Sequence, residues 1–275
     1  MLKKLNQKQN LQHLKNISVF GYTKINNFIR FQHRKSLLKK VLYYFKKINL
    51  ETKDYKGLPK RDRKDLRVYN LPNKHKIFVD LISDYNIEKI LKPLLNDPYY
   101  RMLPNSLPNY IVGSCSARSS GYKLDLHIDS KFPFQGSTPI SIVVLFILED
   151  MNEKNGATIV VPGSHLSGKY TDREFKDVKI INAKAGDVLI LDSRTWHGTT
   201  ENKTKKTRWV IGANMTQWWL KQQVNIPETI SKKLFLKLSN KQRQLLGFCS
   251  IPPSSEQERI NTKCGYEFLK NFRFK

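Results

Sequence analysis

Cysteine is scarce in this sequence, which has three in 275 residues. Cys115, Cys249 and Cys264 lie far apart and form no Cys-x-x-Cys pair. They therefore offer neither a disulfide framework nor the closely spaced thiolates of a structural zinc site. Because free cysteines are typical of a reducing compartment, we predict a cytoplasmic protein.

Long hydrophobic runs are also missing. No stretch of 18 or more apolar residues occurs, so the sequence predicts no membrane-spanning helix. With 39% apolar residues, the chain is nevertheless long enough to bury one sizeable core.

Acidic residues are absent from the first fifty positions. That segment holds twelve Lys and Arg out of a formal net charge of +26, which leaves about +14 for residues 51–275. We therefore predict a basic, partly helical N-terminal segment over residues 1–75. Residues 76–275 would form the main domain, with a C-terminal helix and a tail.

Residues 34–50 carry apolar side chains at helical spacing with lysines between them, which predicts a basic amphipathic helix. Such a helix could rest on an anionic membrane, dock an acidic partner, or pack against the main domain with its charged face in solvent. We predict the third arrangement, and peripheral contact with an anionic membrane is the alternative.

The sequence does contain a split trio of metal-ligating residue types. His127 and Asp129 are separated by one residue, and His197 follows seventy residues after His127. Residues i and i+2 of a strand point to the same side, so the first pair can reach one metal ion. Two imidazoles and one carboxylate form the facial triad that binds non-haem Fe(II) and leaves positions open for substrate and O2. Arg208, eleven residues after His197, adds a permanent cation that can bind a carboxylate through two hydrogen bonds.

Apolar stretches around these residues predict a β protein. Residues 139–148 and 157–161 read as two strands, and the turn signal Asn155-Gly156 between them predicts a hairpin. Residues 184–192 predict a strand that leads towards His197, and residues 208–214 predict another with Arg208 at its start. If the last two strands paired antiparallel, Arg208 would return towards the metal ligands.

Four motifs between Ile111 and about Trp219 match one known family. They are His127-x-Asp129, Asn155-Gly-Ala-Thr-Ile-Val-Val-Pro-Gly-Ser-His165, Ala185-Gly-Asp187, and Trp196-His-Gly-Thr199 followed by Arg208. This part of the chain, a little under half of it, resembles the phytanoyl-CoA dioxygenase family of Fe(II)/2-oxoglutarate oxygenases.

The resemblance implies a double-stranded β-helix, a jelly-roll or cupin-like barrel, in which His127, Asp129 and His197 bind Fe(II). It also implies that Arg208 pairs with the distal carboxylate of 2-oxoglutarate and that Thr199 contacts the same co-substrate. O2 would be the other co-substrate, with ascorbate as a reductant. Related halogenases lack the carboxylate ligand, so the presence of Asp129 favours hydroxylation.

We therefore predict a mainly β barrel with flanking helices over residues 76–95 and 226–238. It would hydroxylate an organic substrate, free or carrier-bound, and convert 2-oxoglutarate to succinate. One alternative is a cupin-type metal enzyme without 2-oxoglutarate, which would keep the triad but not need Arg208. The other is a basic nucleic-acid- or membrane-binding protein on a barrel scaffold. Charge alone supports phosphate binding without specificity, so nucleic acid is not an expected partner.

Overall fold

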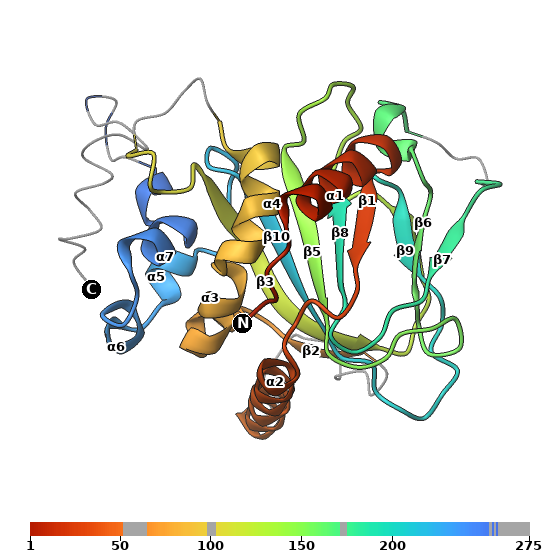
Figure 1. Ribbon diagram of the computed structural model, residues 1–275. Helices are drawn as coiled ribbons and strands as arrows, with labels where there is room; N and C mark the ends of the chain where they lie inside the picture. Colours follow the sequence, from red (N-terminus) through yellow and green to blue (C-terminus); the bar gives the residue numbers. More distant parts are fainter. Residues whose placement is uncertain (52–64, 98–102, 171–174, 253–254, 256, 258–275) are drawn as a thin grey trace.

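Two antiparallel sheets lie face to face, with helices against the outer face of the larger sheet (Figure 1). The computed structural model describes residues 1–51, 65–97, 103–170, 175–252, 255 and 257. The mainly β barrel with flanking helices that the sequence predicts is confirmed. The predicted C-terminal tail lies outside the described residues.

The larger sheet contains six strands within the described chain, in the order β1, β8, β5, β10, β3, β2. Their bounds are Tyr22–Ile25 for β1, Asp65–Val68 for β2, Tyr110–Ser120 for β3, Ser141–Ile147 for β5, Val188–Asp192 for β8 and Val210–Gln217 for β10. The two edge strands, β1 and β2, both come from the first 75 residues. The division of the chain at residue 75 stays a prediction.

The smaller sheet contains four strands in the same described chain, in the order β4, β9, β6, β7. They are β4 (Leu124–His127), β6 (Thr158–Val160), β7 (Lys179–Ile181) and β9 (His197–Thr199). All are short, and three of the four motifs lie in or beside them.

β5 is apolar from Ile142 to Ile147 because both of its faces are covered. Ile142, Val144 and Phe146 pack into the core that the large sheet shares with the helices. Val143 and Ile147 face the smaller sheet. A strand buried on both sides loses the usual alternation of apolar and polar residues, which explains the unbroken hydrophobic run.

Helices cover the outer face of the large sheet and extend the molecule to one side (Figure 1). Their bounds are Gln7–Phe20 for α1, Phe31–Glu51 for α2, Lys76–Ile82 for α3, Tyr85–Leu95 for α4, Ile226–Thr229 for α5, Lys232–Phe235 for α6 and Asn240–Leu245 for α7. Three short 3-10 helices within the described residues are Leu71–Asn73 (η2), Ser164–Leu166 (η3) and Phe248–Ser250 (η4). No helix in the described ranges is both long and apolar enough to span a membrane.

The helices predicted over residues 76–95 are confirmed as α3 and α4, whereas the single helix predicted over residues 226–238 is wrong. That stretch forms α5 and α6 instead. Ser231 begins the second helix by accepting the backbone N–H of Leu234 on its hydroxyl, as an N-cap residue does. The hydrophobic spacing alone predicts one continuous helix, but the N-cap at Ser231 divides it into two.

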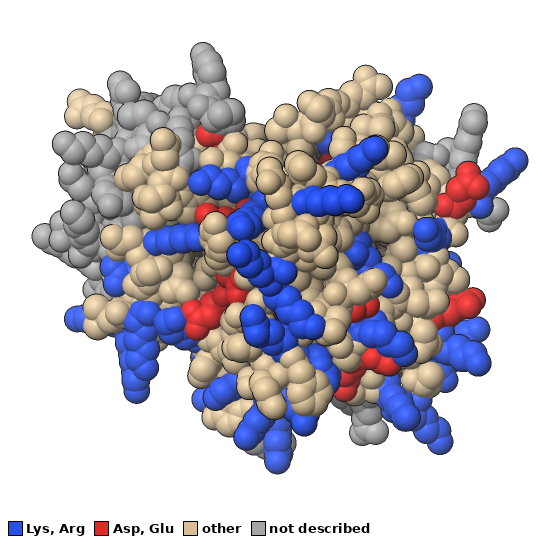
Figure 2. All heavy atoms as spheres, viewed as in Figure 1, with Lys and Arg blue, Asp and Glu red and all other residues tan. Residues whose placement is uncertain are grey.

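The predicted basic helix is present as α2, and it packs against the core. Leu37 and Val41 are completely buried, while Lys35, Lys39 and Lys46 are exposed. Lys and Arg side chains are spread over the face that carries α1 and α2, with few Asp or Glu among them (Figure 2). The helix therefore combines a structural face with a strongly positive outer face.

Two predicted strand pairings are wrong. β5 and β6 form no hairpin, because β5 pairs with β8 and β10 while β6 pairs with β7 and β9 in the other sheet. β10 pairs with β3 and β5 and not with β8, the strand that leads to His197. In a two-sheet barrel, successive strands cross between the sheets, so neighbours in sequence need not pair.

Candidate active site

His127, Asp129 and His197 meet in one cavity between the two sheets. His127 ends β4 and His197 begins β9, and these residues lie opposite each other in the ladder. Asp129 follows the end of β4, with its Oδ1 3.7 Å from His127 Nε2 and its Oδ2 3.5 Å from His197 Nε2. One ligand atom from each side chain lies within 4.8 Å of the others. The three could therefore hold one metal ion, as the spacing predicts.

Both imidazoles are oriented through their second ring nitrogen. His127 Nδ1 lies 2.9 Å from the carbonyl oxygen of Asp125, and His197 Nδ1 lies 2.8 Å from that of Thr195. Because a carbonyl oxygen only accepts, each Nδ1 carries the proton and donates it. Each Nε2 then presents a lone pair towards Asp129, which is the arrangement typical of metal-ligating histidines.

The electrostatics of the trio suit a cation. Burial, followed by the neighbouring His197, lowers the pKa of His127, so this imidazole is neutral at pH 7. Burial by itself would raise the pKa of Asp129, but the contacts with His197 and His127 hold it below its usual range. Burial opposes protonation of His197, yet the carboxylate of Asp129 outweighs it and raises that pKa. A metal cation would replace the proton that His197 and Asp129 attract.

One turn, residues 192–196, holds the segments that carry Asp129 and His197. The carbonyl oxygen of Ser193 accepts the backbone N–H groups of Asp129 at 2.8 Å and of Ser130 at 3.1 Å. The carbonyl of Thr195 accepts His197 Nδ1. Both ligand positions therefore depend on the conformation of this turn.

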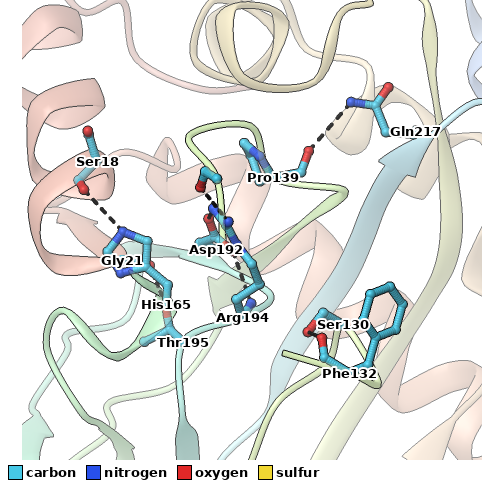
Figure 3. Close-up of polar contacts among 11 residues, drawn as sticks. Ser18, Gly21, Ser130, Phe132, Pro139, His165, Asp192, Arg194, Thr195 and Gln217 are labelled. Atoms are coloured by element: carbon cyan, nitrogen blue, oxygen red, sulfur yellow. Dashed lines mark hydrogen bonds and ion pairs between the residues drawn. The ribbon is translucent and has the colours of Figure 1, made fainter. Parts of the chain in front are cut away.

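A buried ion pair fixes the turn (Figure 3). Arg194 Nε lies 3.0 Å from Asp192 Oδ1 and Nη2 lies 2.7 Å from Oδ2, with the side chains 2% and 3% exposed. Arg194 Nη1 donates to the carbonyl of Gly136 at 2.7 Å, and the guanidinium lies 4.6 Å from the Phe134 ring centroid. Arg194 thus ties the turn to the loop that follows Asp129.

The end of α1 packs onto the same turn (Figure 3). Thr195 Oγ1 donates to the carbonyl of Gly21 at 2.9 Å, and His165 Nε2 donates to that of Ser18 at 3.1 Å. Gly21 has φ +77°, and a Cβ there would collide with the Thr195 hydroxyl and lie 2.7 Å from His165 Nδ1. His165 therefore joins the Pro-Gly-Ser-His motif to α1 and is not one of the converging ligands.

We expect replacement of Arg194 by Met to destabilise the fold by about 3–5 kcal/mol, because Asp192 would remain buried without its cation. The matched control is Lys184→Met, which breaks the exposed pair between Lys184 and Asp150 and should cost at most about 1 kcal/mol. Urea denaturation of the two variants measures the difference. Equal, small losses for both would contradict a structural role for the buried pair.

The cavity has a volume of about 280 Å³, and some strands line it with apolar side chains and others with polar ones. Apolar lining comes from β5 and from the start of β10, through Val143, Leu145 and Val210. Polar lining comes from β3 and from the middle of β10, through Ser114, Ser116 and Asn214. All five predicted site residues line this cavity: His127, Asp129, His197, Thr199 and Arg208.

Arg208 is buried, at 6% exposure, and its guanidinium makes no ion pair with any residue that the structure describes. Its backbone N–H donates to Ser119 Oγ at 2.7 Å, whereas its buried Nε has no hydrogen-bond partner. A Cβ at Gly156 would lie 3.0 Å from Arg208 Nη2, so this glycine leaves room for the guanidinium. Burial, followed by the charge of Arg118, lowers the pKa of Arg208 to about 10, which still leaves it charged at pH 7. A buried, unpaired cation in a cavity indicates an anionic ligand.

Thr199 is half-buried, two residues after His197. Its Oγ1 accepts the backbone N–H of Leu124 at 3.2 Å, which leaves the hydroxyl proton available to donate. Gly198, between His197 and Thr199, cannot be replaced by a larger residue without a shift, because a Cβ there would collide with the carbonyl oxygen of Leu124. The short strand β9 therefore brings a ring nitrogen and a hydroxyl donor into one cavity.

The sequence reasoning missed the contribution of β3 and β2. Ser114, Ser116 and Arg118 line the cavity from alternate positions of β3, and Arg67 lines it from β2. The alternation of polar residues with Cys115 and Ala117, which are buried in the core on the other face, was the available signal. It is easily overlooked, because small polar residues are also common in exposed strands.

Comparison with known proteins agrees with this geometry. The family model for phytanoyl-CoA dioxygenase matches residues 19–210. "Uncharacterized protein Rv1501" of Mycobacterium tuberculosis is 29% identical over 112 residues, which cover 40% of this chain and 41% of that relative. "Dioxygenase FUM3" of Gibberella moniliformis is 34% identical over 107 residues, which cover 38% of this chain and 35% of that protein. The chain thus spans about two fifths of the length of these relatives.

Solved structures share the fold. HygX from Streptomyces hygroscopicus, crystallised with nickel and 2-oxoglutarate, superposes with a TM-score of 0.58 at 18% identity, covering 80% of this chain and 90% of HygX. The non-heme alpha ketoglutarate dependent carbocyclase SnoK from nogalamycin biosynthesis has a TM-score of 0.58 at 17% identity, covering 78% of this chain and 84% of SnoK.

Proposed function

Because the chain belongs to the phytanoyl-CoA dioxygenase family, we propose that it is a non-haem Fe(II)/2-oxoglutarate-dependent dioxygenase that hydroxylates an organic substrate. One observation carries the proposal: a three-ligand set and a buried cation, unpaired among the described residues, share one cavity. 2-Oxoglutarate has an oxo acid group suited to a metal ion at one end and a carboxylate suited to a guanidinium at the other.

In this proposal His127, Asp129 and His197 hold Fe(II) through Nε2, a carboxylate oxygen and Nε2. Two imidazoles and one carboxylate are a ligand set typical of ferrous iron, and the Nδ1 hydrogen bonds keep both rings in position. When bound, the iron lets O2 react with 2-oxoglutarate, which yields succinate, CO2 and a hydroxylated product. As a ligand, Asp129 would take the position that related halogenases leave without a carboxylate, which favours hydroxylation.

Arg208 would bind the distal carboxylate of 2-oxoglutarate, because a guanidinium matches a carboxylate with two parallel N–H···O bonds. Thr199 would add a hydroxyl donor, since its Oγ1 accepts the backbone N–H of Leu124 and its own proton can point to the ligand. The apolar side chains of Val143 and Leu145 line the same cavity. An electrostatic bond is stronger in such surroundings than in water.

We propose that only the reacting part of the substrate enters the cavity. A volume of about 280 Å³ is at the low end for a ligand pocket, and the co-substrate would take part of it. The rest of the substrate would stay outside, where a carrier could be attached. For comparison, HygX has been crystallised with hygromycin B, a small molecule.

The test is release of succinate from 2-oxoglutarate with Fe(II) and ascorbate, with and without O2. We expect O2-dependent succinate even without added substrate, because enzymes of this class turn over slowly in its absence. A cupin-type enzyme would show metal-dependent chemistry that does not change when 2-oxoglutarate is omitted. Absence of both succinate and 2-oxoglutarate binding would refute the proposal.

We also propose that the outer face of α2 makes peripheral contact with anionic lipid. Phe31 and Tyr43 are exposed on α2, as are Lys35, Lys39 and Lys46, and no acidic residue precedes Glu51 in the chain. Basic amphipathic helices with aromatic side chains bind such surfaces.

Exchange of these three lysines for Gln should weaken binding to phosphatidylserine vesicles by about 1 kcal/mol per residue at low salt. The matched control exchanges three other exposed lysines on and just after α6 for Gln, namely Lys232, Lys233 and Lys237. Co-sedimentation at two salt concentrations measures the effect. Equal binding to neutral phosphatidylcholine vesicles would exclude an electrostatic surface contact.

A further inference from the structure

A second guanidinium lines the cavity beside Arg208. Arg118 lies on β3 opposite Val210 of β10, two residues after Arg208. Arg118 and Arg208 are close enough that the charge of the first contributes to the lowered pKa of the second. Two neighbouring cations repel each other, so we expect a negatively charged group to lie between them when a ligand is bound.

Arg118 is held in place by polar contacts on one side of its side chain. Its Nε lies 3.0 Å from Asp65 Oδ1, and its Nη2 donates to Ser120 Oγ at 3.1 Å. Asp65 Oδ2 also accepts Arg67 Nε at 2.7 Å, so one carboxylate contacts two guanidinium groups. Within the described chain, Nη1 of Arg118 has no hydrogen-bond partner, and the residue lines the cavity.

Strand register places Arg118 and Arg208 at the same end of the cavity. Val210 of β10 pairs with Ile147 at the end of β5, whereas Thr216 pairs with Ser141 at its beginning. The metal-ligand segment lies at the Ser141 end, because Ser193 donates its N–H to Ser141 and accepts that of Asp129. A molecule that reaches from the metal ligands to Arg208 therefore ends next to Arg118.

We propose that Arg118 is a second binding residue for the distal carboxylate of 2-oxoglutarate, positioned by Asp65 of β2. This inference rests on the function proposed above. The carboxylate would lie between Arg208 and Arg118 and accept hydrogen bonds from both. Each carboxylate oxygen has two acceptor positions, so one group can serve two guanidiniums and Thr199. The arrangement makes an edge strand from the first 75 residues part of the co-substrate site.

The measurement is a comparison of two ligands, 2-oxoglutarate and 2-oxovalerate, which has a methyl group in place of the distal carboxylate. Their affinities are determined anaerobically by titration calorimetry with Mn(II) in the metal site. Arg118→Met should weaken 2-oxoglutarate binding about 10- to 100-fold, as for loss of a charged hydrogen bond, and leave 2-oxovalerate and Mn(II) binding unchanged. Lys123→Met is the matched control, because it removes one exposed positive charge from the connection between β3 and β4.

A second variant, Asp65→Asn, keeps the guanidinium and removes its anchor. It should weaken 2-oxoglutarate binding less than Arg118→Met does, again without effect on 2-oxovalerate. Equal losses of affinity for both ligands, or loss for neither, would overturn the role of Arg118. The proposed function would still stand in that case, provided that the wild-type protein binds 2-oxoglutarate. Reduced turnover of a primary substrate at unchanged 2-oxoglutarate affinity would also overturn it, by assigning Arg118 to that substrate. If the wild-type protein binds no 2-oxoglutarate, both the proposed function and this inference fail.

Discussion

His197→Ala is expected to remove stoichiometric Fe(II) binding and to reduce succinate formation to background. Loss of an outer hydrogen-bond partner of a metal ligand typically costs 10- to 100-fold in affinity, so loss of the ligand itself should exceed about 100-fold. The side chain lies at the cavity and outside the apolar core clusters, so the variant should still fold. Anaerobic titration with Fe(II) measures binding, and circular dichroism measures folding.

The matched control for this variant is His33→Ala, because His33 is a half-buried histidine on α2 and belongs to no ligand cluster among the described residues. It should bind iron like the wild-type protein. Full iron-dependent turnover by His197→Ala would show that the assigned ligand set is wrong. Unfolding of that variant would instead assign His197 a structural role, and Asp129→Ala would then provide the independent test.

Arg208→Met should weaken 2-oxoglutarate binding and leave Fe(II) binding nearly intact. Loss of one partner of a buried charge pair costs about 2–5 kcal/mol, which corresponds to roughly 30- to 5,000-fold in the dissociation constant. Calorimetric titration with 2-oxoglutarate, with the metal already bound, measures the effect. Equal loss of iron and co-substrate binding would indicate that Arg208 supports the fold of the site instead.

The same variant should be more stable than the wild-type protein when no ligand is present. Burial lowers the pKa of Arg208 from its ordinary value to about 10 in the folded protein, so the charged form is destabilised by about 3 kcal/mol relative to the unfolded chain. At pH 7, below both values, the folded protein carries this cost in full. A higher melting temperature for ligand-free Arg208→Met, together with lost 2-oxoglutarate binding, would show that Arg208 lowers the stability of the fold while it provides co-substrate binding. A lower melting temperature would contradict an unpaired guanidinium.

The chemistry of the site was largely readable from local sequence. His127 and Asp129 sit at strand spacing, and Arg208 follows His197 at a spacing that matches one family. The strands with long apolar runs were also predictable, because a run such as residues 139–148 is too apolar to lie anywhere except between two layers. These features depend on residue type and on spacing over a few positions, which a sequence displays directly.

Only the tertiary structure decided which strands pair and what surrounds the ligands. β5 and β6 are neighbours in sequence but belong to different sheets, and β2 reaches the cavity from far along the chain. The pair formed by Asp192 and Arg194 has a local spacing that is common on surfaces, yet here it is buried and fixes both ligand segments. Pairing and burial depend on contacts between residues distant in sequence. For that reason hydrophobic spacing identifies a strand without identifying its partners, and a charged residue does not reveal whether it will be buried.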